Sequence, residues 1–242
     1  MSWEPLYSQL RHGLIVSCQA APDEPLFGTE FMVGMARAAV EGGAVGIRAN
    51  GPESIAAIRK AVALPIIGLY KFDLPGFEVR ITPTINHAKE IAAAGADLIA
   101  LDATARSHPD GIATADFIAR VRAATQRPVM ADVSTVAEGL AAAEASAEVV
   151  GTTLSGYTSY SRPGPGPDFD LIRELAPLLH ARGVLLIAEG RIATPEQAAQ
   201  ALDLGADAVV VGGAITRPQW ITRRFVEALN HTHSFRDTDA DV

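Results

Sequence analysis

The chain has 242 residues, of which 48% are hydrophobic and 6% aromatic, and its formal net charge is −8. This apolar content is enough for a large buried core, and a length of roughly 250 residues is common for α/β barrels that form one domain. The negative charge argues against nucleic acid or an anionic membrane surface as the main partner, so we expect neither.

Cysteine usage and the N-terminus bear on the compartment. Cys18 is the only cysteine, which excludes an intramolecular disulfide and fits a reducing cytosol. The N-terminus lacks the basic segment and apolar run of a signal peptide, and no apolar stretch is long enough to span a bilayer. We therefore expect a cytoplasmic protein without a membrane partner.

Eight apolar segments alternate with stretches of helical periodicity along the chain. The predicted strands span residues 13–18, 44–48, 65–70, 97–102, 128–132, 148–153, 184–188 and 208–211. The predicted helices span residues 29–41, 52–62, 84–94, 114–125, one segment capped by Ser134, 170–181, one segment starting at Thr194, and 218–229. Such a series predicts a single (β/α)8 TIM barrel over residues 1–230.

The terminal segments and one long loop complete this organisation. Residues 1–12 carry Trp3, Leu6, Tyr7 and Leu10 at helical spacing, as in the short helices that often close the bottom of a barrel. Residues 154–167 form the longest predicted loop, which follows the sixth strand. Residues 231–242 are polar, and we expect a disordered tail there.

Two glycine-containing turns follow the last two predicted strands. They are Glu189-Gly190-Arg191-Ile192 and Gly212-Gly213-Ala214-Ile215-Thr216, and a helical pattern follows each. Glycines allow backbone N–H groups to approach a ligand closely, and a helix start adds its positive end. Because the loops after strands seven and eight often bind phosphate in such barrels, the sequence predicts a phosphate site here.

Polar side chains stand where the predicted strands end, which is where barrel enzymes carry their chemistry. In chain order they are Gln19, Arg48, Lys71, Asp102, Asp132, Thr152, Thr153, Glu189 and Arg217. Any one of them could be a solvated charge at the barrel rim. As a set, they converge on one mouth beside the glycine turns, which favours a functional site.

Lys71 and Glu189 are the most informative members of this set, because they lie four strands apart on opposite sides of the predicted barrel. A lysine in a partly desolvated pocket can act as a base or attack a carbonyl as an amine. Together with a facing carboxylate it could remove and return a proton next to a carbonyl. The alternative is a simple ion pair.

Metal and serine-nucleophile chemistry have weaker support. The six histidines lack metal-ligand spacing, and a divalent ion held by Asp102 and Asp132 alone would have few ligands. The hydroxyls of Ser17 and Ser155 have no evident histidine partner. We expect no metal, and we expect Cys18 to be a small core residue.

Eight segments of the chain together resemble a known family. They are residues 46–50 (GIRAN), 65–71 (PIIGLYK), 82–84 (TPT), 101–104 (LDAT), 130–132 (MAD), 151–158 (GTTLSGYT), 188–192 (AEGRI) and 212–218 (GGAITRP). This combination is similar to the N-acetylmannosamine-6-phosphate 2-epimerases of bacterial sialic acid catabolism, and it covers nearly the whole chain. The resemblance implies interconversion of N-acetylmannosamine 6-phosphate and N-acetylglucosamine 6-phosphate without a metal or an organic cofactor, and it makes a homodimer plausible.

The resemblance also implies roles for single residues. Lys71 would be the acid/base residue at C2, and Glu189 the carboxylate that works with it. The sugar would be bound by Gln19, Arg48, Asp132, Thr153 and Arg217. The phosphate would be bound by the backbone of Gly190, Arg191, Gly212 and Gly213. The family often has a second basic residue near Ser107-His108-Pro109, so His108 leaves that one contact open.

Two other functions use the same residues. Lys71 could form a Schiff base with a keto or aldehyde substrate, which would make the protein an aldolase or lyase. A barrel that binds a phosphosugar without reaction would need the glycine turns, but it would not need a lysine opposed to a glutamate.

Overall fold

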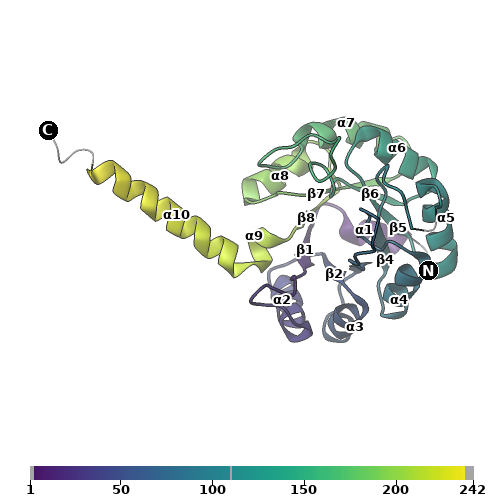
Figure 1. Ribbon diagram of the computed structural model, residues 1–242, viewed down its shortest axis with the longest axis horizontal. Coiled ribbons are helices and arrows are strands. Elements are labelled where there is room, and N and C mark those ends of the chain that lie inside the picture. Colours follow the sequence, from purple (N-terminus) through teal and green to yellow (C-terminus); the bar gives the residue numbers. More distant parts are fainter. Residues whose placement is uncertain (1–2, 110, 238–242) are drawn as a thin grey trace.

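The computed structural model describes residues 3–109 and 111–237, with residues 231–237 as backbone only. Within these residues, eight parallel strands pair in sequence order, and β1 pairs with β8 to close a barrel. Helices surround the barrel (Figure 1). This confirms the predicted (β/α)8 TIM barrel. No helix in the described part of the chain is long and apolar enough to cross a membrane.

The predicted strands and helices all have counterparts, with shifts at their ends. The strands are β1 (Leu14–Cys18), β2 (Gly46–Asn50), β3 (Ile66–Leu69), β4 (Leu98–Asp102), β5 (Val129–Asp132), β6 (Val149–Gly151), β7 (Leu185–Glu189) and β8 (Ala208–Val211). The helices are α1 (Glu4–Leu10), α2 (Thr29–Glu41), α3 (Pro52–Ala61), α4 (Ile85–Ala93), α5 (Thr114–Thr125), α6 (Val136–Glu144), α7 (Phe169–His180), α8 (Pro195–Asp203), α9 (Gly213–Thr216) and α10 (Pro218–Asp237).

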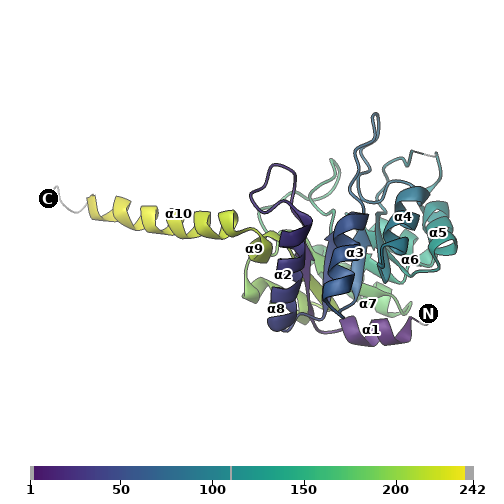
Figure 2. The same cartoon turned by 90° about the horizontal axis from the view of Figure 1, so that it is seen from below.

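The strands bury both of their faces, which explains their continuous apolar sequence. Alternate side chains such as Ile15, Ile67 and Val210 fill the barrel interior, whereas Val16 and Ile47 pack beneath the helices. Leu10 of α1 joins the interior cluster, and α1 lies across one end of the barrel (Figure 2). The amphipathic lead-in therefore closes the bottom of the barrel.

The N-terminus of α6 corrects one prediction. Thr135, and not Ser134, is the N-cap residue, and its side chain accepts a hydrogen bond from the backbone N–H of Glu138. The Glu138 side chain reaches back to the N-cap backbone, which completes a capping box. The three-residue spacing between Thr135 and Glu138 is the sequence signal that identifies the cap. Ser134 instead donates its hydroxyl to Glu138 at 2.8 Å.

The C-terminal segment differs most from the sequence-based expectation. The second glycine turn is itself a short helix, α9, and α10 continues past Leu229 to Asp237. No Gly or Pro interrupts residues 219–237, so nothing in the sequence forces the helix to end earlier. The predicted disordered tail is therefore helical up to Asp237, and residues 238–242 lie outside the described residues. In both views α10 stands away from the barrel (Figures 1 and 2).

Candidate active site

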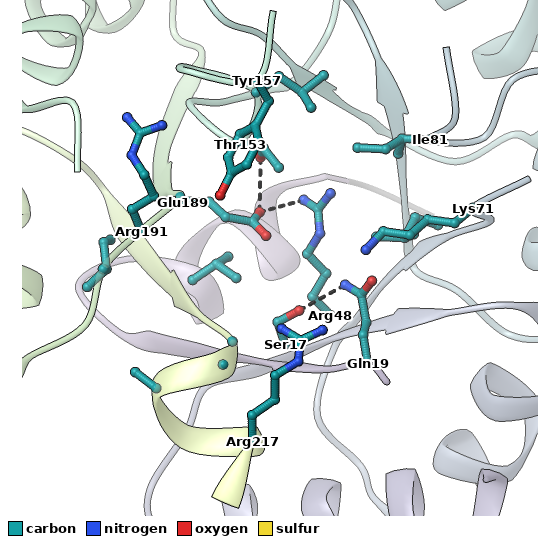
Figure 3. Close-up of a pocket in the computed structure, with 18 of the residues that line it drawn as sticks. Ser17, Gln19, Arg48, Lys71, Ile81, Thr153, Tyr157, Glu189, Arg191 and Arg217 are labelled. Carbon is teal, nitrogen blue, oxygen red and sulfur yellow. Dashed lines mark hydrogen bonds and ion pairs between the residues drawn. The ribbon is translucent and has the colours of Figure 1, made fainter. Parts of the chain in front are cut away.

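A cavity of about 800 Å³ opens at the carboxyl ends of the strands. Its walls include almost all the residues predicted to bind or react with a substrate (Figure 3). These are Gln19, Arg48, Lys71, Thr153, Glu189, Gly190, Arg191, Gly212, Gly213 and Arg217. Asp132 is the exception, because it is fully buried and does not line the cavity.

Arg48 and Asp132 form a buried ion pair beneath the cavity. The guanidinium of Arg48 donates to both carboxylate oxygens of Asp132, at 3.1 and 2.5 Å, and its Nη1 lies 2.8 Å from Oε2 of Glu189. The Arg48 side chain is only 1% exposed. Burial opposes its charge, but the adjacent carboxylates of Asp132 and Glu189 raise the pKa of Arg48. Asp132 thus holds Arg48, which in turn holds Glu189.

Two consecutive threonines fix Glu189 from the neighbouring strand. The Thr152 hydroxyl donates to the carbonyl oxygen of Glu189 at 2.9 Å and accepts from its backbone N–H at 3.0 Å. The Thr153 hydroxyl lies 3.0 Å from the Glu189 carboxylate and 2.7 Å from that of Asp132. Burial raises the pKa of Glu189, although the charge of Arg48 acts in the opposite direction.

Lys71 reaches the cavity from the opposite side of the barrel (Figure 3). Its backbone N–H donates to the side-chain oxygen of Asn50 at 2.7 Å, and an antiparallel bridge joins Lys71 to Ile81. These contacts fix the backbone of Lys71 just after the end of β3. Desolvation by the cavity walls and the positive charge of Arg48 lower the pKa of Lys71, while Glu189 opposes this change.

The first glycine turn presents its backbone to the cavity, whereas the Arg191 side chain points elsewhere. Gly190 and Arg191 both have positive φ, +112° and +56°. The Arg191 guanidinium donates to the carbonyl oxygens of Gly166 and Ser155, each at 2.6 Å. The side chain of Arg191 therefore ties down the long loop after β6, and its backbone is the part suited to an anion.

The second glycine turn is shaped by close packing against α10. A Cβ atom on Gly213 would lie 2.5 Å from the ring of Trp220, so a side chain at this position would displace the start of α10. Arg217, between α9 and α10, stacks on Trp220 with its guanidinium carbon 4.5 Å from the ring centre. The turn and the first residues of α10 thus form one wall of the cavity.

Several charged residues that the sequence-based prediction missed lie in or beside the cavity, among them Arg106 and Glu24. Arg106 lines the cavity and lies 3.5 Å from the carboxylate of Asp102, four residues earlier in the sequence. This spacing after a strand end is a signal that could have identified Arg106. Glu24 accepts from Nη2 of Arg217 at 3.0 Å, and this pairing lowers the pKa of Glu24. A separation of 193 residues hides the second pair from sequence inspection.

His108 does not supply the basic contact left open by the sequence. It is 2% exposed, and its ring lies 4.1 Å from the ring of Phe117, between ring centres. Arg106 is the nearby basic residue that faces the cavity.

The residues considered for a metal site and for a serine nucleophile have other partners in the structure. The carboxylate of Asp102 accepts from the backbone N–H and hydroxyl of Thr104 at 2.9 and 2.6 Å, and Asp132 is bound by Arg48. Among the described residues, no cluster of three or more His, Cys, Asp or Glu side chains is arranged to bind a metal ion. Ser155 donates to Asp168 at 2.6 Å rather than to a histidine.

Comparisons with known proteins agree on one family. Residues 32–231 match the family described as "Putative N-acetylmannosamine-6-phosphate epimerase". Two relatives named "Putative N-acetylmannosamine-6-phosphate 2-epimerase" come from Caldanaerobacter subterraneus subsp. tengcongensis and Cutibacterium acnes. The first is 50% identical over 91% of this chain and 92% of its own length. The second is 46% identical over 93% of this chain and 96% of its own length.

Solved structures give the same result. The N-acetylmannosamine-6-phosphate 2-epimerase from Clostridium perfringens superimposes with a TM-score of 0.88 at 44% identity, over 92% of this chain and 96% of that one. A thiamine phosphate pyrophosphorylase from Pyrococcus furiosus, at 18% identity and a TM-score of 0.59, shares only the fold. The chain therefore belongs to the N-acetylmannosamine-6-phosphate epimerase family.

Proposed function

We propose that the protein interconverts N-acetylmannosamine 6-phosphate and N-acetylglucosamine 6-phosphate by removing and returning the proton at C2. The observation that carries this proposal is the position of Lys71 and Glu189, which face each other across one cavity beside two glycine turns (Figure 3). Family membership supports the same substrate pair.

The chemistry requires a group that accepts a carbon-bound proton and a group that donates one. In the open-chain sugar, C2 lies next to the C1 aldehyde, so loss of its proton gives an enolate that hydrogen-bond donors can stabilise. The pKa of Lys71 is lowered and that of Glu189 is raised, so both move towards neutrality. Such opposite shifts suit a pair that exchanges protons with one substrate near neutral pH.

The remaining residues would bind and orient the substrate. Gln19 and Arg217 lie on the cavity wall, where they can contact the sugar or its N-acetyl group. The backbone of Gly190, Arg191, Gly212 and Gly213 would hold the phosphate. We assign Asp132 an indirect role, because its carboxylate is buried on Arg48 rather than open to the cavity.

Proton NMR of N-acetylmannosamine 6-phosphate in heavy water, with added chelator, tests the proposal. We expect N-acetylglucosamine 6-phosphate that carries deuterium at C2. Lys71→Ala and Glu189→Ala should each lose most of this activity, and Lys89→Ala, an exposed lysine on α4, is the matched control. An unchanged spectrum with folded wild-type protein would refute the epimerase. Normal turnover by both variants would refute the roles assigned to Lys71 and Glu189.

A Schiff-base aldolase or lyase is the second candidate, because the lowered pKa of Lys71 also suits an amine nucleophile. Borohydride reduction in the presence of the phosphosugar, followed by mass spectrometry, separates the two. A covalent adduct on Lys71 would favour the lyase, whereas solvent exchange at C2 without an adduct would favour the epimerase. Thermal stabilisation by the sugar with neither result would indicate a binding protein.

We also propose that the protein is a homodimer in which α10 packs against a second copy. α10 stands away from its own barrel (Figure 2). It exposes apolar side chains, including Phe225 at 69% and Val226 at 49%. Apolar side chains exposed along a helix commonly mark an interface. Light scattering after size exclusion should give twice the chain mass, and Phe225→Asp should shift the protein to monomer. A monomeric wild type would refute this proposal.

A further inference from the structure

The Thr153 hydroxyl bridges two carboxylates that end the strands on either side of β6. Its Oγ1 lies 2.7 Å from Oδ1 of Asp132 on β5 and 3.0 Å from Oε2 of Glu189 on β7. The space beneath this bridge depends on Gly151. A Cβ atom there would lie 3.0 Å from both Thr153 Oγ1 and Asp132 Oδ1, and 2.4 Å from the terminal carbon of Met130.

Counting protons shows why this bridge is unusual. A threonine hydroxyl has one proton to donate, and an ionised carboxylate can only accept. Both distances are within the range of O–H···O hydrogen bonds. If Asp132 and Glu189 are both ionised, the hydroxyl can donate to one of them at a time. When it donates to Glu189, it adds a hydrogen bond to that anion, while Asp132 keeps both donors of Arg48. When Glu189 carries a proton, Glu189 can donate to Thr153 while Thr153 donates to Asp132.

The neighbouring charges decide which carboxylate takes that proton. Arg48 binds both oxygens of Asp132 but only one oxygen of Glu189, so Asp132 is the better compensated anion. Glu189 also faces Lys71 across the cavity, and Arg217 lines the same cavity. Burial and the charge of Asp132 favour the protonated form of Glu189, whereas Arg48, the Thr153 hydroxyl and Lys71 favour the ionised form.

We infer that Thr153 is a positioning residue for Glu189, whose hydroxyl donates to Asp132 when Glu189 is protonated and to Glu189 when it is ionised. Glu189 then keeps a hydrogen-bond partner in both states and can gain or lose a proton without moving. This role differs from the one expected from the sequence, in which Thr153 would bind the sugar. Its consequence for catalysis rests on the proposed epimerase activity, but the proton sharing itself can be measured without turnover.

The test is a pH titration of the Glu189 carboxyl carbon by NMR in protein labelled at glutamate, with the signal assigned by its loss in Glu189→Gln. Thr153→Val keeps the shape of the side chain and removes the hydroxyl that favours the ionised form. We expect its Glu189 midpoint to rise by about one pH unit, the scale of a hydrogen bond to a charged group. Thr153→Ser should titrate near the wild-type midpoint. Thr153→Ala serves as a second hydroxyl-free variant if Thr153→Val does not fold.

Thr152→Val is the matched control, because the Thr152 hydroxyl bonds to the backbone of Glu189, whereas the Thr153 hydroxyl bonds to its carboxylate. Its midpoint should stay at the wild-type value. An unchanged midpoint in the hydroxyl-free variants, or an equal rise in Thr153→Ser, would overturn the inference. In active protein, one limb of the plot of kcat/KM against pH should disappear in Glu189→Gln. In the Thr153 variants, this limb should move together with the Glu189 midpoint. If the wild type proves inactive, the proposed function fails, and the titration still decides the role of Thr153.

Discussion

Removing the carboxylate of Asp132 should destabilise the whole barrel, because it leaves Arg48 as a poorly compensated buried charge. Arg48 is 1% exposed, and its Nε has no hydrogen-bond partner among the described residues. In Asp132→Ala the guanidinium would retain one carboxylate partner in the described part of the chain, Glu189 at 2.8 Å. Breaking a buried ion pair by removing one partner costs about 3–5 kcal/mol. The remaining Glu189 contact places our expectation at about 3 kcal/mol, the lower end of that range.

Urea unfolding followed by circular dichroism measures this cost, at one fixed protein concentration because assembly would contribute to stability. The matched control is Asp73→Ala, which breaks the Arg80–Asp73 pair. Those side chains are 61% and 72% exposed, so the change should stay within about 0.5 kcal/mol. A loss below about 1 kcal/mol in Asp132→Ala would refute the reasoning.

A double variant sharpens the same test. Arg48→Met removes the buried charge that Asp132→Ala leaves behind. Replacing both members of a buried pair by apolar side chains is often close to neutral, so the double variant should be more stable than Asp132→Ala alone. A double variant less stable than Asp132→Ala would show that Arg48 stabilises the barrel through something other than this pair.

Three further predictions concern Lys71, the long loop and the cysteine. Lys71→Met should raise the midpoint of thermal unfolding at pH values where Lys71 is charged, because the lowered pKa of Lys71 means that folding disfavours its ammonium form. This gain in midpoint should shrink as the pH rises from the pKa of Lys71 in the folded protein towards the ordinary lysine pKa. A gain independent of pH would contradict this. Gly156→Ala should raise KM several-fold in the epimerase assay, because a Cβ at this position would lie 1.9 Å from Nη1 of Arg191 and the backbone φ is +79°. Gly164→Ala is the control, because a Cβ there would lie in open space, and it should leave KM unchanged. Cys18 should resist iodoacetamide in native protein at neutral pH and react in urea, since burial raises its pKa to about 12; fast labelling of folded protein, detected by mass spectrometry, would be inconsistent with this.

The barrel could be predicted because its strands are buried on both faces and therefore consist of consecutive apolar residues. The positions of Lys71 and Glu189 could also be predicted, since active sites of such barrels are built at the carboxyl ends of the strands. The sequence is less informative on what a strand-end charge contacts. Arg48 and Asp132 are 84 residues apart, and only the closed barrel shows that they bind each other.

Element ends were harder to predict for a different reason. The strand β6 ends at Gly151, and the hydroxyls of the two residues that follow it, Thr152 and Thr153, bond to Glu189. Periodicity cannot resolve a shift of this size, because both threonines are also good strand residues. The polar sequence after His231 predicts disorder, whereas α10 continues to Asp237, because polar residues form helices readily where packing does not decide.

The net charge of −8 and an anionic phosphosugar are compatible because charge is unevenly distributed over the molecule. Among the described residues that line the cavity, seven are arginine or lysine and three are aspartate or glutamate. Several of these cations are already paired, Arg48 with Asp132 and Arg217 with Glu24, so they fix geometry as well as attract anions. Among the described residues, Lys71 has no comparable carboxylate contact within ion-pair distance, and burial and the charge of Arg48 both oppose its own charge. The pairing that holds the other cations in place therefore leaves Lys71 as the cation in the cavity best able to exchange a proton.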